Sequence, residues 1–79
     1  MRVTVQYYAM LREQAGRNEE SRETTAGTVG ALYEELARVY RLTLPVGQLR
    51  AAINDQFVDW DAPLREGDRV IFIPPVAGG

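Results

Sequence analysis

The chain has 79 residues and a formal net charge of −2, and 46% of its residues are hydrophobic; this composition is typical of one small folded domain. Because it contains no Cys, His or Lys, it cannot form a disulfide, a cysteine or histidine metal site, a lysine Schiff base or a histidine general base. We expect no metal and no resident cofactor. With no basic stripe, signal peptide or membrane-spanning apolar run, we also expect a cytoplasmic protein that binds neither nucleic acid nor membrane.

The first half of the chain begins with an expected strand over residues 2–8, where apolar and polar side chains alternate. Tyr8 breaks the pattern, because it puts an aromatic side chain on the polar face of that strand. Residues 9–15 favour a short helix, which Gly16 is suited to end. Residues 19–25 are rich in charge and predict a strand at the edge of a sheet, where charged side chains discourage pairing with another chain.

The strongest helix signal begins at Thr28, a residue type that is suited to the N-cap position. The apolar residues that follow recur at helical spacing, at Val29, Leu32, Leu36 and Val39. This pattern predicts an amphipathic helix whose apolar stripe packs on one face of a sheet.

Three more strands are expected, over residues 49–53, 56–60 and 69–73, with turns between them. Since one main helix can cover only one face of a sheet, this order predicts a single two-layer α+β domain over residues 1–79. Its first and last strands are the most apolar, so we expect them side by side at the centre of a mixed sheet. The β-grasp (ubiquitin-like) fold has this arrangement.

The last strand has four consecutive apolar residues, so both of its faces are apolar. If Val70 and Phe72 face the helix, then Ile71 and Ile73 face the uncovered side of the sheet, where Tyr8 joins them. An apolar patch of this kind on a small domain is typical of a partner surface. The alternative is a central strand with ordinary, scattered exposed apolar residues.

The residues after this strand carry the most unusual chemistry of the chain. Pro74 and Pro75 end the strand and favour an extended backbone, so we expect a flexible tail over about residues 74–79. Gly78 and Gly79 can enter a channel too narrow for any Cβ, and the Gly79 carboxylate is unhindered for attack on a nucleotide phosphate. A terminal Gly-Gly alone can also be a functionless frayed end. In a chain without Cys, His or Lys, the terminal carboxylate is the one unusual group that remains.

Several motifs together carry a resemblance to known proteins. They are Val3-Thr-Val-Gln-Tyr-Tyr-Ala9, Leu11-Arg12-Glu13 with Ala15-Gly16, Ala52-Ile53-Asn54, Pro63-Leu64 with Gly67-Asp68, and Phe72-Ile73-Pro74-Pro75-Val76-Ala77-Gly78-Gly79. Through them the chain resembles, over essentially its whole length, the molybdopterin synthase small subunit (MoaD) family of ubiquitin-like sulfur carriers.

The resemblance implies that an E1-like enzyme, which consumes the ATP, adenylates Gly79, and that sulfur transfer then leaves a thiocarboxylate there. It implies a non-catalytic sulfur-donor subunit, whose tail enters the active site of the large molybdopterin synthase subunit. There the carrier gives sulfur to precursor Z (cyclic pyranopterin monophosphate) and forms the dithiolene of molybdopterin, in a heterotetramer of two small and two large subunits. Gly78 provides an approach without a side chain, and Tyr8 and Ile73 match family positions that face the partner. Together with Ile71, Pro74, Pro75 and Val76, they are the partner contacts that we expect.

Two residues depart from the family pattern. Ile73 is aliphatic where the family usually has an aromatic residue, and Arg69 stands where the family usually has an acidic one. If position 69 pairs with the partner, a compensating acid is needed across the interface. Two alternatives remain open: a related carrier for tRNA thiolation, thiamine or cysteine synthesis, or protein modification; and a bare β-grasp interaction module whose Gly-Gly is incidental.

Overall fold

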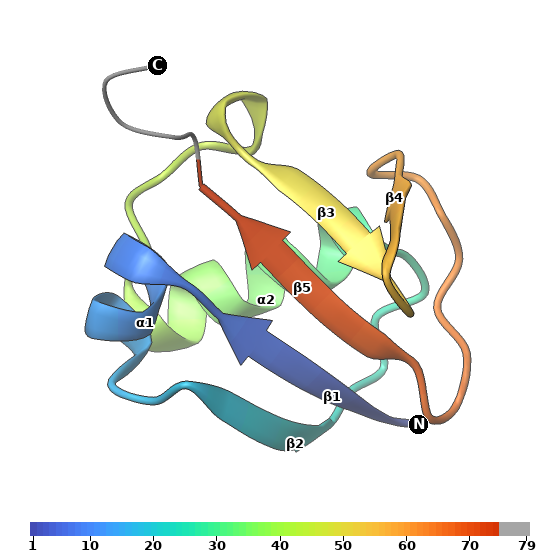
Figure 1. Ribbon diagram of the computed structural model, residues 1–79. Coiled ribbons are helices and arrows are strands. Elements are labelled where there is room, and N and C mark those ends of the chain that lie inside the picture. Colours follow the sequence, from blue (N-terminus) through green and yellow to red (C-terminus); the bar gives the residue numbers. More distant parts are fainter. Residues whose placement is uncertain (75–79) are drawn as a thin grey trace.

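The computed structural model describes residues 1–74, and Figure 1 shows their arrangement. These residues form five strands, two α-helices and one short 3-10 helix. In chain order the elements are β1 (Arg2–Tyr7), α1 (Ala9–Ala15), β2 (Glu19–Glu23), α2 (Val29–Tyr40), η1 (Val46–Gln48), β3 (Arg50–Ile53), β4 (Gln56–Val58) and β5 (Arg69–Ile73).

The five strands form one mixed sheet in the order β2-β1-β5-β3-β4. The first and last strands pair in parallel, with Val5 opposite Val70, and the other neighbours pair antiparallel. The predicted central pairing of these two apolar strands is therefore confirmed. Helix α2 crosses behind the sheet in Figure 1, and the face toward the viewer is not covered by a helix. This is the predicted two-layer β-grasp architecture.

Helix α2 begins as the sequence predicts, since the Thr28 Oγ1 accepts a hydrogen bond of 3.1 Å from the backbone N–H of Ala31. The predicted apolar stripe is wrong at one position. Val39 is 52% exposed, whereas Tyr33 is 3% exposed and belongs to the core. At 100° per residue, Val39 lies about 80° from Val29 around the helix, at the margin of the buried stripe. Tyr33 lies nearer its centre.

The core lies between α2 and the facing side of the sheet. Val70 and Phe72 of β5 are fully buried there, as the alternation predicted. The Phe72 ring lies 5.2 Å from the Tyr33 ring and 6.1 Å from the Trp60 ring, measured between centroids. Gly30 lets the start of α2 approach the loop after β4, because a Cβ at this position would lie 2.9 Å from the Trp60 carbonyl oxygen.

Four strands are shorter than predicted. β1 ends at Tyr7, because Tyr8 is already the N-cap residue of α1. β2 ends at Glu23 because Thr24 turns inward, where it is 4% exposed and its Oγ1 donates to Glu35. β4 ends at Val58, and the carbonyl of Trp60 accepts a hydrogen bond from the N–H of Gly30 instead of from a strand. β3 begins one residue late, at Arg50.

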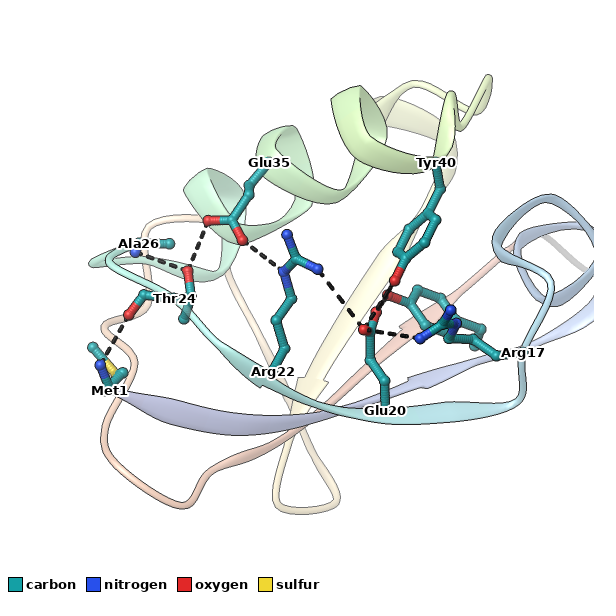
Figure 2. A network of polar contacts seen from close by, with 9 residues as sticks. Met1, Arg17, Glu20, Arg22, Thr24, Ala26, Glu35 and Tyr40 are labelled. Atoms are coloured by element: carbon teal, nitrogen blue, oxygen red, sulfur yellow. Dashed lines mark hydrogen bonds and ion pairs between the residues drawn. The ribbon is translucent and has the colours of Figure 1, made fainter.

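A polar network joins the edge strand β2 to α2 on the buried side of the sheet (Figure 2). The Glu20 side chain is 9% exposed and accepts hydrogen bonds from the hydroxyls of Tyr7 and Tyr40. Arg22 donates from Nε to Glu35 over 2.6 Å, and its Nη1 lies 3.8 Å from Glu20. Burial and the adjacent Glu20 carboxylate together raise the pKa of Tyr7 far above its ordinary value. These contacts let a charged strand pack without leaving buried polar atoms unpaired.

No helix within residues 1–74 combines the length and the apolar composition that are needed to span a membrane.

Candidate functional site

The candidate site begins where β5 ends. Ile73 is the last residue of the strand, it pairs with Arg50 of β3, and Pro74 follows it outside the sheet. The predicted end of the strand is confirmed. Because proline has no N–H to donate, Pro74 cannot continue the ladder. The other predicted tail residues, Pro75, Val76, Gly78 and Gly79, lie outside the described residues, so their roles stay predictions.

The side of the sheet opposite α2 adjoins this end. Since Val70 and Phe72 face α2, the alternate residues of β5 lie on the opposite side. The strand pairings extend this side across the sheet. We call it the open face, and its described strand residues are Glu19, Ser21, Glu23, Arg2, Thr4, Gln6, Arg69, Ile71, Ile73, Arg50, Ala52 and Phe57.

Ile71 lies on the open face, as predicted. It is flanked by Gln6 of β1 and Ala52 of β3, and because neighbours on both sides cover it, it is only 9% exposed. Ile71 and Ala52 therefore form an apolar floor on this face, and the partner contact of Ile71 stays a prediction.

Tyr8 is exposed beside this floor, at 45% of its surface. It lies just beyond β1 as the N-cap residue of α1, with an extended backbone at φ −123° and ψ 152°. Its neighbour Tyr7 pairs with Phe72 in parallel register. Tyr8 follows Tyr7 and Ile73 follows Phe72 in the chain, so Tyr8 and Ile73 lie at the same end of the sheet.

Phe57 is the residue that the sequence reasoning missed. It is the most exposed large apolar residue among the described ones, at 60%, and it pairs with Ala52 across β3 and β4. The Asn54-Asp55 turn and strict alternation could have placed it on the open face. The guanidinium of Arg50 lies over its ring, with Cζ 4.2 Å from the ring centroid.

A groove of about 460 Å³ lies between this pair and the end of β5. It is open along one side and is lined by Gly47, Gln48, Leu49, Arg50, Phe57, Ile73 and Pro74. The exposed aromatic residues, the apolar floor and the groove thus meet at the end of the sheet from which the chain leaves at Pro74.

Within residues 1–74, the open face offers a surface for binding a partner. No group of three or more Asp, Glu, His or Cys within residues 1–74 could hold a metal ion. The buried carboxylate of Glu20 lies on the α2 side, where tyrosine hydroxyls donate to it.

Comparison with known proteins agrees with the fold and this geometry. A family model described as the ThiS family matches residues 5–79. The molybdopterin synthase sulfur carrier subunit of Escherichia coli (strain K12) is 38% identical over 80 residues, which cover 98% of this chain and 99% of that protein.

Solved structures show the same relationship. The putative molybdopterin converting factor subunit 1 from Pyrococcus furiosus has a TM-score of 0.79 at 31% identity, covering 96% of this chain and 99% of that one. A chain in the complex of subunits 1 and 2 of the molybdopterin-converting factor from Helicobacter pylori has a TM-score of 0.70 at 26% identity, with both chains fully covered. The chain therefore belongs to the ThiS family and is related, over nearly its whole length, to the molybdopterin synthase sulfur carrier subunits (MoaD).

Proposed function

We propose that this chain is the sulfur carrier subunit of a molybdopterin synthase and that Gly79 carries the sulfur. The observation that carries the proposal is the match to the E. coli carrier subunit over 98% of this chain. The ThiS family match extends through Gly78 and Gly79. The position of Pro74, beside the exposed residues of the open face, supports a tail that is presented to a docked partner.

In the proposed activation, an oxygen of the Gly79 carboxylate attacks the α-phosphate of ATP, and pyrophosphate leaves. An E1-like partner binds the ATP, and this chain contributes only the carboxylate. Sulfide, as HS⁻ from the sulfur donor, then displaces AMP from the acyl-adenylate and, after loss of its proton, leaves a thiocarboxylate on Gly79. Because this activation consumes ATP, we propose that the chain acts in the cytoplasm.

In the proposed delivery, the open face docks on the large synthase subunit, and the tail reaches a precursor held there. Tyr8, Ile73 and Pro74 lie at the end of the sheet that would meet this partner. Gly78 and Gly79 have no side chain to obstruct a narrow entrance. The precursor is precursor Z, and its sulfuration yields the dithiolene. The complex of subunits 1 and 2 from H. pylori supports the class of partner, in an assembly that we propose to be a heterotetramer.

The loading step is tested by incubating the chain with ATP, a sulfur donor and an E1-like activating enzyme. We expect the intact mass to rise by one oxygen-to-sulfur exchange, located in the C-terminal peptide. Gly79→Ala should load poorly, because its methyl group obstructs the approach to the carboxylate. Gly27→Ala is the matched control, since a Cβ at Gly27 meets no atom within 4 Å. An unchanged mass, or sulfur elsewhere in the chain, would contradict the proposal.

The alternative carrier functions share this loading chemistry and differ in the partner. If the loaded chain sulfurates tRNA, or supplies thiamine or cysteine synthesis, and leaves precursor Z unchanged, the assignment to molybdopterin synthase is wrong. If Gly79 attaches to other proteins instead, the chain is a protein modifier. A bare interaction module would bind its partner equally well with and without the last two residues and would accept no sulfur.

A further inference from the structure

The charges of the open face are segregated by strand. Its two acidic residues, Glu19 and Glu23, both lie on the edge strand β2. β1, β3 and β5 contribute Arg2, Arg50 and Arg69 and no acidic residue. A chain with a net charge of −2 thus carries only positive charge on the central strands of this face.

One of these arginines is already paired within the chain. The Nη2 of Arg2 lies 3.2 Å from Glu23, and its Nη1 donates to the Ser21 hydroxyl. Arg50 and Arg69 are also exposed, but no carboxylate within residues 1–74 lies within ion-pair distance of either guanidinium. These two charges are available to a docked surface.

The two arginines lie on either side of the apolar floor. Arg69 is two residues from Ile71 on the same side of β5, which is a separation of about 7 Å along a strand. Arg50 pairs with Ile73 at the other end, and its guanidinium lies 4.2 Å from the centroid of the Phe57 ring. Stacking restricts a guanidinium and leaves its N–H groups free to bind a carboxylate. Arginine and aromatic residues are also enriched among the few interface residues that contribute most of the binding energy.

We infer that the protein surface that docks on the open face presents carboxylates to Arg69 and Arg50, so that this chain selects its partner by charge as well as by apolar fit. The inference rests on the proposed function, because it concerns the partner that receives the tail. A neutral or basic partner surface would leave both guanidinium groups desolvated without a counter-charge, which costs binding free energy.

Of these two arginines, Arg69 should contribute more to partner binding. Asp59 and Asp61 line a hollow together with Arg50, so they partly offset its charge and would repel an incoming carboxylate. On the open face, Arg69 lies beside Thr4 of β1 and Ile71 of β5, and on the β3 side its backbone hydrogen-bonds Asn54. All three residues are uncharged. Reversing the charge at Arg69 should therefore weaken binding more than reversing it at Arg50.

The test measures binding of the full chain to the cognate large synthase subunit, together with conversion of precursor Z by the wild-type pair. Arg69→Glu is compared with Arg69→Gln and with Arg38→Glu, a matched reversal at an exposed residue of α2 on the other side of the molecule. Thermal unfolding of each variant confirms that it is folded. We expect Arg69→Glu to lower affinity by at least about tenfold, Arg69→Gln by less, and Arg38→Glu by no more than about twofold.

The salt dependence of binding distinguishes an effect of charge from an effect of shape complementarity. The deficit of Arg69→Glu should be large at about 0.1 M salt and should largely disappear at about 1 M, where the screening length falls from about 10 Å to about 3 Å. If wild type converts the precursor but Arg69→Glu binds as tightly as wild type, or no worse than Arg38→Glu, the inference fails and the proposed function stands. If wild type neither binds the large subunit nor converts the precursor, both fail.

Discussion

Phe72 and Ile73 are neighbours in β5, but they lie on opposite sides of the sheet and have different surroundings. Phe72 is fully buried among Tyr33, Trp60 and the rest of the core, whereas Ile73 is half-buried on the open face beside Pro74. The same contrast holds for charge. On the α2 side the carboxylate of Glu20 is enclosed by hydrogen-bond donors, and on the open face Arg69 has no described partner.

This contrast indicates a division of roles. The α2 side contains the apolar burial and the paired polar groups that stabilise a small domain. The open face leaves aromatic and cationic groups at the surface, where they add little to stability. Substitutions on the two sides should therefore separate the free energy of unfolding from partner binding.

The largest loss of stability is expected for Phe72→Ala. Removing a buried aromatic ring should lower the free energy of unfolding by about 3–5 kcal/mol, measured by urea denaturation. Phe57→Ala is the matched substitution on the open face and should cost less than about 1 kcal/mol. Equal costs for the two variants would contradict the division between the sides.

Glu20→Ala should have the next largest effect. It leaves the buried hydroxyls of Tyr7 and Tyr40 without their acceptor, which should cost about 1–3 kcal/mol of unfolding free energy. Glu20→Gln keeps one acceptor oxygen and should cost less. If both variants unfold at the same urea concentration as the wild type, the network does not hold β2 to α2.

Ile73→Asp tests whether a substitution on the open face weakens partner binding more than it lowers stability. Because the side chain is only half-buried, the change should lower the free energy of unfolding by about 1 kcal/mol. Binding to the large subunit should fall more than about tenfold, since a charge enters the apolar part of the interface. Unfolding of the variant at room temperature would show that Ile73 belongs with the core. Unchanged binding by a folded variant would show that Ile73 lies outside the interface.

The smallest effect is a pH dependence at Glu35. Burial alone would raise the pKa of this carboxyl, but hydrogen bonds from Arg22 and Thr24 outweigh burial and hold it below its ordinary value. Its contribution to stability is therefore present above the unfolded pKa of about 4.3 and lost as pH falls through the lower, folded pKa.

The matched variant is Glu35→Gln. The difference in unfolding free energy between wild type and Glu35→Gln should be greatest near neutral pH and should shrink in acid. Glu23, whose pKa is lowered by the amino terminus, is present in both proteins and cancels in the difference. A difference that stays constant with pH would show that the Glu35 charge does not contribute.

Much of the fold could be predicted because its signals are local. Alternation placed Val70 and Phe72 on the α2 side, and Thr28 fixed the start of α2. Val39 was misplaced because one spacing rule fits several helical faces, and only packing against the sheet selects among them. The lengths of β2 and β4 depended on hydrogen bonds between distant residues, which a local pattern does not contain.

The site was predicted in part. The end of β5 and the position of Tyr8 beside Ile73 follow from proline chemistry and strand register, and both are confirmed. Alternation also placed Ile71 on the open face, but it could not give the low exposure of this residue, which depends on the flanking strands β1 and β3. Phe57 was missed because the three residues of β4 give little periodic signal by themselves, and its face follows only when the Asn54-Asp55 turn is used to set the register against β3.

The most direct test of the account is sulfur delivery in the reconstituted pair. The chain is loaded as a thiocarboxylate at Gly79, mixed with the large subunit and precursor Z, and the sulfurated pterin is measured. We predict conversion in proportion to the loaded chain, and none with the unloaded chain or with a chain lacking Gly79 whose thermal midpoint is unchanged. Conversion without the loaded Gly79, or no conversion with it, would contradict the account.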